Sequence, residues 1–170
     1  FESLIRINRY GRVVYPGEFI SIAEKSRMIL NIDKWVIKNV MESFSEVLKK
    51  CGSEILISIN ISASHLLDKC FLPDLRRALE ETGFPPRCLE IEVTESVCLA
   101  SVEHAVVVLN KLRDMGISLA IDDFGTGYAS LNYLAKLPVQ LLKIDKSFID
   151  RIALDDGADE FVRAIISMGH

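Results

Sequence analysis

The stretch AIDDFGTGYASL, residues 120–131, places two adjacent aspartates directly after a short apolar run and directly before a glycine-framed loop. The segment ISLAID, residues 117–122, is typical of a buried strand that ends at Asp122, and Asp123 begins the loop. The carboxyl ends of parallel strands are where α/β barrels and doubly wound sheets hold their sites. The stretch therefore predicts a parallel α/β fold with a functional site at this aspartate pair.

Helical and strand-like segments alternate along the rest of the chain, which is typical of parallel strands joined by crossover helices. The expected strands are residues 1–6, 55–60, 88–93, 117–122 and 140–145. Helical periodicity covers residues 16–23, 31–49, 72–81, 102–115 and 158–168, and it predicts that Trp35 lies in the core. A complete barrel of this type needs eight strands and about 250 residues. The fold is therefore either an open doubly wound sheet or a partial TIM-like (β/α) barrel with about five of eight parallel strands.

Length and composition predict one globular domain over residues 1–170. Apolar residues make up 49% of the chain and charged residues 26%, which is ordinary for such a protein. We find no membrane span and no leader, so we expect a soluble, cytoplasmic domain whose parent protein could be membrane-anchored. The formal net charge of -4 argues against a general nucleic-acid binder. An anionic ligand would therefore need a local source of positive charge, such as a bound metal ion.

Alternation along the strands collects polar side chains on one face, because successive residues of a strand point to opposite sides. These polar positions are Asn60, Glu92, Asp122, Lys143 and Asp145, and Asp123 follows just beyond. On the first strand, Glu2, Leu4 and Arg6 alternate with their neighbours and therefore share one face. Burying several carboxylates together is costly unless a cation compensates their charge. Carboxylates with one amide oxygen suit Mg²⁺ or Mn²⁺ better than zinc, and adjacent aspartates can hold two such ions.

Six motifs, taken in order along the chain, resemble those of the EAL domain, the bacterial phosphodiesterase of cyclic di-GMP. They are Glu2-Ser3-Leu4 with Arg6, PGEFISIAE, SINIS, LEIEVTES, AIDDFGTGYASL and LPVQLLKIDKSF. The resemblance covers essentially the whole chain, with Ser3 in place of the signature alanine. It implies metal-dependent hydrolysis of cyclic di-GMP to linear pGpG, in bacterial second-messenger signalling.

The resemblance assigns five residues to metal ions. Glu2, Asn60, Glu92 and Asp122 match the ligands of one Mg²⁺ or Mn²⁺ ion. Asp122 would also bridge to a second ion, which Asp123 binds as well. A further glutamate of the second site would lie after His170, so we expect this site to be incomplete in the chain.

Five more residues are predicted to act in catalysis or substrate binding, three of them by the resemblance. Lys143 matches a lysine that positions or polarises the attacking water, and Glu95 matches a glutamate that steadies the loop after the aspartate pair. Arg6 matches an arginine that contacts the substrate phosphate, and Leu4 and Asp145 are also predicted substrate contacts. Asp145 is equally compatible with a cap for the helix that follows it.

The resemblance further predicts how the domain is completed and assembled. The first strand of the full barrel would lie before Phe1 and its last strands after His170. We expect a homodimer formed through residues 124–130 and the following helix, and fusion to sensory or GGDEF-type domains. Two alternatives remain: a catalytically inactive EAL-type receptor or regulatory module for cyclic di-GMP, and a fragment whose exposed strand edges pair with a second copy.

Overall fold

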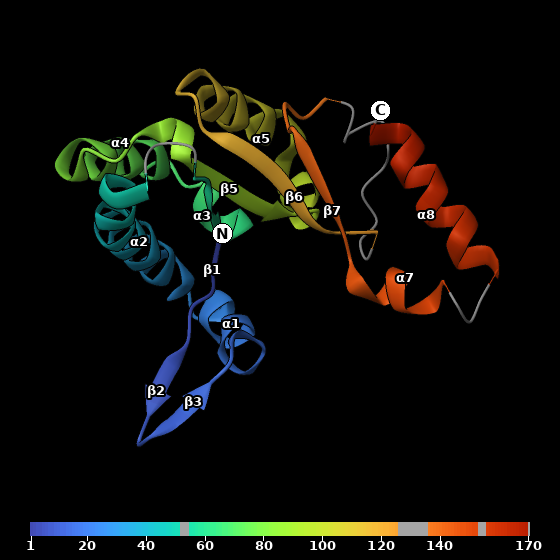
Figure 1. Cartoon of the computed structure of the whole chain (residues 1–170), viewed down its shortest axis with the longest axis horizontal. Helices are drawn as coiled ribbons and strands as arrows, with labels where there is room; N and C mark the ends of the chain where they lie inside the picture. Colours follow the sequence, from blue (N-terminus) through green and yellow to red (C-terminus); the bar gives the residue numbers. More distant parts are fainter. Residues whose placement is uncertain (52–54, 126–135, 153–155, 170) are drawn as a thin grey trace.

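The computed structural model describes residues 1–51, 55–125, 136–152 and 156–169, and at its centre lies a five-stranded parallel sheet (Figure 1). The strands are β1 (Glu2–Ser3), β4 (Ile57–Asn60), β5 (Leu89–Thr94), β6 (Ser118–Phe124) and β7 (Leu141–Ile144). Their order in the sheet, β1-β4-β5-β6-β7, follows their order in the chain. A doubly wound sheet would reverse direction at a switch point. The fold is therefore the partial TIM-like barrel, and the predicted α/β class is confirmed.

Helices lie between the parallel strands, and two more follow the last strand. They are α1 (Pro16–Lys25), α2 (Ile29–Cys51), α3 (Ala63–Leu66), α4 (Phe71–Thr82), the 3-10 turn η1 (Pro86–Cys88), α5 (Ser96–Asp114), α7 (Lys146–Arg151) and α8 (Asp156–Gly169). Helix α4 ends at Gly83, whose φ of 64° suits a residue without a Cβ. Among the described residues, no helix is both long and apolar enough to cross a bilayer.

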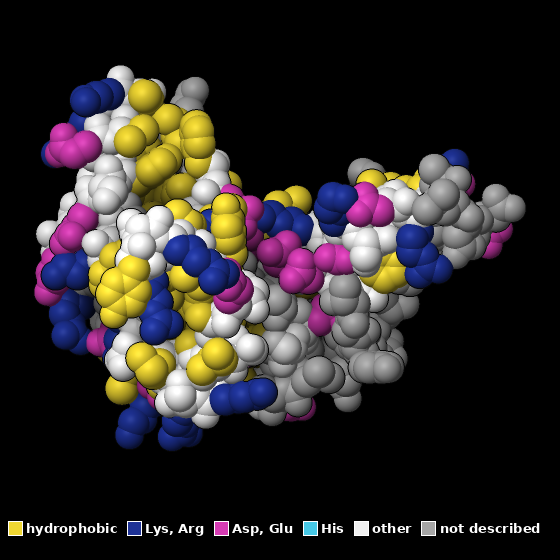
Figure 2. Space-filling model, turned by 90° about the horizontal axis from the view of Figure 1, so that it is seen from below, with side chains coloured by type: hydrophobic (Ala, Val, Ile, Leu, Met, Phe, Trp, Pro, Cys, Tyr) yellow, Lys and Arg dark blue, Asp and Glu magenta, His cyan; other side chains and the backbone are white. Residues whose placement is uncertain are grey.

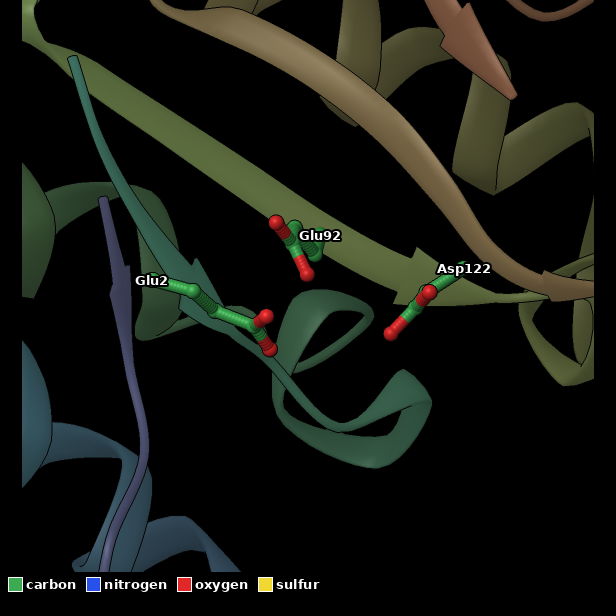
Figure 3. Close-up of side chains that lie close together, drawn as sticks. All are labelled: Glu2, Glu92 and Asp122. Carbon is green, nitrogen blue, oxygen red and sulfur yellow. The ribbon is translucent and has the colours of Figure 1, made fainter. Parts of the chain in front are cut away.

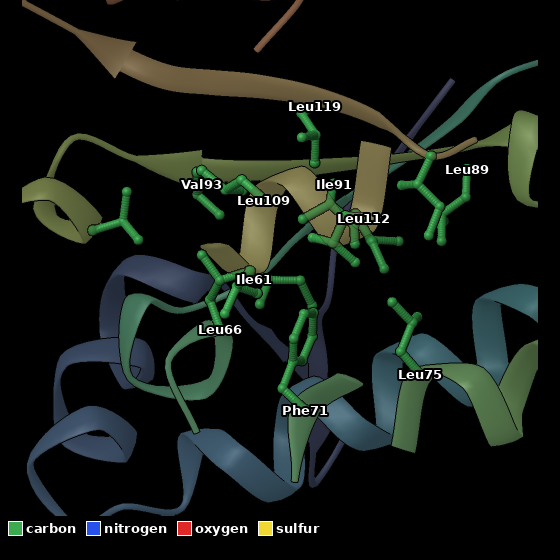
Figure 4. Close-up of a cluster of buried hydrophobic side chains, with 14 of the residues drawn as sticks. Ile61, Leu66, Phe71, Leu75, Leu89, Ile91, Val93, Leu109, Leu112 and Leu119 are labelled. Carbon is green, nitrogen blue, oxygen red and sulfur yellow. The ribbon is translucent and has the colours of Figure 1, made fainter. Parts of the chain in front are cut away.

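The hydrophobic core lies between the sheet and the helices α2, α4 and α5 (Figure 4). The sheet contributes the apolar parity of its strands, represented by Ile59, Ile91 and Leu119, each with no exposed surface. The prediction that Trp35 belongs to this core is wrong, because its side chain is 58% exposed. Trp35 borders a groove beside β1 instead. The prediction failed because helical periodicity identifies the apolar stripe of a helix but not which residues at the edge of that stripe are covered.

The segment predicted as one strand, residues 1–6, is shorter in the structure and leads into a hairpin. Strand β1 spans only Glu2–Ser3, and the antiparallel strands β2 (Ile7–Arg9) and β3 (Arg12–Val14) follow it. Tyr10 and Gly11 join them with φ values of 51° and 80°, as a two-residue hairpin turn requires. The hairpin extends away from the sheet in Figure 1. A tyrosine in the left-handed region is uncommon, so this turn could not be predicted from residue types alone.

Candidate metal centre and active site

Three carboxylates from three strands meet at the carboxyl end of the sheet. Glu2 lies on β1, Glu92 on β5 and Asp122 on β6, and their side chains point toward one another (Figure 3). One oxygen of each lies within 4.8 Å of the others. Within the described part of the chain, no other acidic, histidine or cysteine side chains gather in this way. The arrangement suits a hard cation that prefers oxygen ligands.

Two further predicted residues contact this carboxylate cluster of Glu2, Glu92 and Asp122. The side-chain amide of Asn60, at the end of β4, donates to Glu2 Oε1 at 3.0 Å. The ammonium of Lys143, on β7, donates to Glu92 Oε1 and lies 3.8 Å from Glu2 Oε2. The other Glu92 oxygen, Oε2, is buried and accepts no hydrogen bond from the described residues. An orphaned carboxylate oxygen inside a cluster of carboxylates is the environment in which a cation would be bound.

The electrostatics of the cluster show a shortage of positive charge. Burial raises the pKa of Glu92 above its ordinary value of 4.5, and the Glu2 carboxylate adds to this, although Lys143 opposes it. Burial also raises the pKa of Asp123 above 3.8, and repulsion from Asp122 and Asp145 raises it further. The pKa of Lys143 would be lowered by burial alone, but its hydrogen bond to Glu92 and the surrounding carboxylates outweigh that effect and raise it above 10.5.

The aspartate pair lies on a distorted strand. The prediction that β6 ends at Asp122 is wrong, because the strand continues to Phe124, which pairs with Ile144 of β7. The pairing register shifts between Ile121 and Phe124, and Asp123 has a φ of 52°. Regular alternation would turn two successive side chains to opposite faces, whereas this irregularity lets Asp122 and Asp123 line the same cavity.

The cavity beside the cluster has a volume of about 400 Å³. Its polar end is lined by Glu2, Asn60, Glu92, Asp122 and Asp123, together with the predicted substrate contact Leu4. Its other end, toward α1 and α2, is lined by apolar side chains that include Ile20, Ile29 and Val36. Figure 2 views the end of the sheet where the strands terminate, and acidic side chains gather there next to apolar ones. The cavity therefore offers both charged and apolar surface to a ligand.

Glu95 lies behind the aspartate pair rather than in the cavity lining. It is 6% exposed at the N-terminal end of α5, and its carboxylate accepts a hydrogen bond from the backbone N–H of Gly125 at 2.5 Å. This contact holds the first residue after β6, and the steadying of the rest of the loop stays a prediction. Residues 126–135, which include most of the predicted dimer loop, lie outside the described residues.

Arg6 and Asp145 are not brought to the cavity lining. The guanidinium of Arg6 donates to the carbonyl oxygen of Ile5 at 2.8 Å and lies 4.9 Å from the centre of the Tyr15 ring. Asp145 is the N-cap of α7, where its Oδ1 accepts from the backbone N–H of Ser147 at 2.9 Å. Of the two alternatives for Asp145, the structure contains the helix cap.

The chain matches a known protein family over its whole length. The family model described as the EAL domain matches residues 1–170. The chain belongs to the EAL domain family. The matched residues include all five strands of the parallel sheet and the three carboxylates of the cluster.

Several known proteins are similar to this chain. The signaling protein YkoW of Bacillus subtilis is 41% identical over 170 residues, which cover 99% of this chain and 21% of YkoW. The cyclic di-GMP phosphodiesterase NbdA of Pseudomonas aeruginosa is 37% identical over 153 residues, covering 90% of this chain and 20% of NbdA. A solved structure of the PaMucR phosphodiesterase in complex with c-di-GMP has a TM-score of 0.93 and 35% identity, covering 99% of this chain and 68% of that one. The chain therefore spans about a fifth of the curated relatives.

One buried polar residue next to the carboxylate cluster was not identified from the sequence. Asp33 of α2 is only 4% exposed and lines the same cavity as the carboxylate cluster. It occupies the apolar face of its helix, between Ile29 and Ile37 at spacings of four residues. A charged residue on a buried helical stripe was the available signal, because such a residue needs a specific partner inside the protein.

Proposed function

We propose that this EAL domain hydrolyses cyclic di-GMP to linear pGpG, with the carboxylate cluster as its active site. The observation that carries the proposal is the meeting of Glu2, Glu92 and Asp122 from three separate strands, where one buried oxygen of Glu92 has no hydrogen-bond partner among the described residues. The relative NbdA is named a cyclic di-GMP phosphodiesterase, and PaMucR is a phosphodiesterase solved with c-di-GMP. Both similarities support the same reaction at this site.

The metal ligands in this proposal are the oxygen donors at the strand ends. Glu2, Asn60, Glu92 and Asp122 hold one Mg²⁺ or Mn²⁺ ion, because hard divalent cations prefer carboxylate and amide oxygens. Asp122 and Asp123 are the contribution of this chain to a second ion, and the irregularity in β6 supports this by turning both into one cavity. When bound, such ions polarise the phosphodiester and make the attacking water more acidic.

The protein groups around the cluster have distinct tasks. Lys143 stays protonated through neutral pH because its pKa is raised, so it acts as a hydrogen-bond donor to water or phosphate and not as a base. Glu95 fixes the backbone at Gly125, which follows the aspartate pair. Leu4 supplies apolar contact beside Glu2.

Two predicted substrate contacts, Arg6 and Asp145, already have other partners in the structure. Arg6 reaches the substrate phosphate by leaving the ring of Tyr15, and an exposed cation–π contact is weak enough for this, at about 0.5–1 kcal/mol. Asp145 combines its role as the cap of α7 with contact to the ligand through Oδ2, the carboxylate oxygen that does not accept from Ser147.

The native assembly in this proposal is larger than the chain. Flanking sequence supplies the remaining strands of the barrel, which is supported by the greater length of the PaMucR chain. A homodimer forms through residues 124–130 and the following helix, and sensory or GGDEF-type domains belong to the same polypeptide. The domain works in the cytoplasm, within a protein that could be anchored to the membrane elsewhere. The greater length of the curated relatives supports the presence of further domains.

The test is a hydrolysis assay on the native protein with cyclic di-GMP and Mn²⁺, in which the product pGpG is separated by chromatography. We expect turnover that is lost in Glu2→Gln, since the change removes one carboxylate of the cluster. The matched control is Glu80→Gln on the exposed face of α4, which should leave turnover unchanged. Absence of turnover, combined with metal-independent binding of cyclic di-GMP, would refute the proposal in favour of the receptor alternative.

A further inference from the structure

The buried carboxylate of Asp33 is bound to the turn that follows Asn60. Its Oδ2 accepts hydrogen bonds from the backbone N–H of Ser62 at 3.0 Å and from the Ser62 hydroxyl at 2.6 Å. Ser62 comes two residues after Asn60 and is the N-cap of α3, where its hydroxyl accepts from the backbone N–H of His65 at 3.2 Å. Asp33 therefore connects helix α2 to the turn between β4 and α3.

The imidazole of His65 lies next to this contact and is itself buried. Its Nδ1 is 3.4 Å from Asp33 Oδ2, and the ring meets Phe71 edge-on with centroids 5.0 Å apart. The hydroxyl of Ser62 donates to Asp33, and neither ring nitrogen of His65 has a hydrogen-bond partner among the described residues. Asp33, Ser62 and His65 therefore form no nucleophile–base relay. The contact between Asp33 and Ser62 instead fixes the position of the turn.

A second contact holds the same turn from the side of the metal cluster. The backbone N–H of Ile61 donates to the carbonyl oxygen of Glu92 at 2.9 Å. The turn is thus fixed to β5 by Ile61 and to α2 by Ser62. The Asn60 amide, which reaches Glu2, is carried by the residue immediately before these two anchors. Its position therefore depends on both of them.

The burial of Asp33 is difficult to explain by stability alone. A buried carboxylate loses its hydration, and well-packed apolar residues of similar volume are often as stabilising in such positions. What an apolar residue at position 33 would not provide is an acceptor for both donors of Ser62. We propose that Asp33 is a positioning residue that acts through Ser62 to set the Asn60 amide in the metal cluster. This inference rests on the proposed function, in which Asn60 is a metal ligand.

The first experiment measures Mn²⁺ affinity in the native protein by electron paramagnetic resonance of the free ion. Asp33→Ala and Ser62→Ala should each weaken Mn²⁺ binding about 10- to 100-fold, as does the loss of partners that orient metal ligands. The double variant should bind Mn²⁺ no more weakly than Asp33→Ala, because Asp33→Ala already removes the hydrogen bond from the Ser62 hydroxyl that Ser62→Ala deletes. Ser62→Thr keeps the hydroxyl and should restore the affinity. Native affinity in Asp33→Ala, or additive losses in the double variant, would overturn the inference.

Matched variants separate positioning from general loss of stability. Ile37→Ala removes a 3% exposed side chain one turn further along α2 and should leave Mn²⁺ affinity within about 2-fold of the native protein. Asp33→Asn keeps the shape of the side chain and one acceptor, so it should remain folded and bind Mn²⁺ with intermediate affinity. If Ile37→Ala weakened Mn²⁺ binding as much as Asp33→Ala, the effect would be one of stability and the positioning role would be wrong.

A second readout needs no metal. Hydrogen exchange of the Ile61 amide, which bonds Glu92 and does not touch Asp33, should be about 10-fold faster in metal-free Asp33→Ala than in Ile37→Ala. Equal exchange in the two variants would overturn the positioning role. If the native protein fails to bind Mn²⁺, the metal site of the proposed function is wrong, and the exchange of Ile61 still decides whether Asp33 fixes the turn.

Discussion

Replacing Lys143 by methionine tests the electrostatic account of the site most directly. Methionine has a similar length and no charge, so the change removes the ammonium that donates to Glu92. Glu92 has no exposed surface, and removing one partner of a buried ion pair costs about 3–5 kcal/mol. The Lys143 side chain is 29% exposed, so water compensates part of this loss. We expect the free energy of unfolding at neutral pH to fall by about 2–3 kcal/mol in the metal-free protein.

The loss should depend on pH in a definite direction. The folded pKa of Lys143 is raised, so its contribution to stability is present below about pH 10.5 and is lost as pH rises through the folded pKa. The folded pKa of Glu92 is also raised, so its carboxyl takes up a proton as pH falls toward 4.5 and then no longer needs a cation. The destabilisation by Lys143→Met should therefore be largest between these two folded pKa values and should shrink in acid.

The assay is urea denaturation of the metal-free native protein and of the variant, at neutral pH and at about pH 4. Lys146→Met makes the same chemical change on the exposed surface of α7 and should cost less than about 0.5 kcal/mol at either pH. Hydrolysis by Lys143→Met should fall about 10²- to 10⁴-fold while Mn²⁺ affinity is retained. Equal destabilisation at both pH values, or a loss of Mn²⁺ affinity, would refute the reasoning.

Three further predictions follow from the same contacts. Mn²⁺ affinity should fall as pH drops through the raised pKa values of Glu92 and Asp123, with proton release on binding measured by calorimetry in different buffers; a flat profile down to about pH 4.5 would contradict this. Glu95→Gln should cost about 1 kcal/mol in urea denaturation, because a neutral acceptor replaces the carboxylate that binds Gly125, and an effect larger than that of Glu95→Ala would be inconsistent with it. Phe71→Ala should cost about 3–5 kcal/mol by the same measurement, because the side chain is fully buried, and a loss below about 1 kcal/mol would show that the core there is not packed as described.

Much of the candidate site could be predicted from the sequence. The parity of residues along β4, β5 and β6 places Asn60, Glu92 and Asp122 on one face, and the structure has them at one end of the sheet. This succeeds because alternation in a strand is fixed by the backbone and does not depend on neighbours. The same regularity fails at Asp123, where the pairing of β7 with β6 shifts the register.

Contacts between distant segments account for most of what the sequence did not reveal. Asp33 and Ser62 are 29 residues apart, and nothing in either segment specifies that α2 packs against the turn after β4. The exposure of Trp35 likewise depends on which elements cover the edge of α2. Helical periodicity defines a stripe of apolar residues, whereas burial of each member is set by tertiary packing.

The sequence by itself determined the class of fold, the order of the chemistry-bearing motifs and the face on which their polar residues lie, because these depend on local backbone periodicity. Only the tertiary structure decided that the carboxylates of Glu2, Glu92 and Asp122 approach within 4.8 Å, that Lys143 is their counter-ion and that Asp33 anchors the turn beside Asn60. These distances follow from the stagger and twist of neighbouring strands and from the packing of α2, which no local pattern encodes.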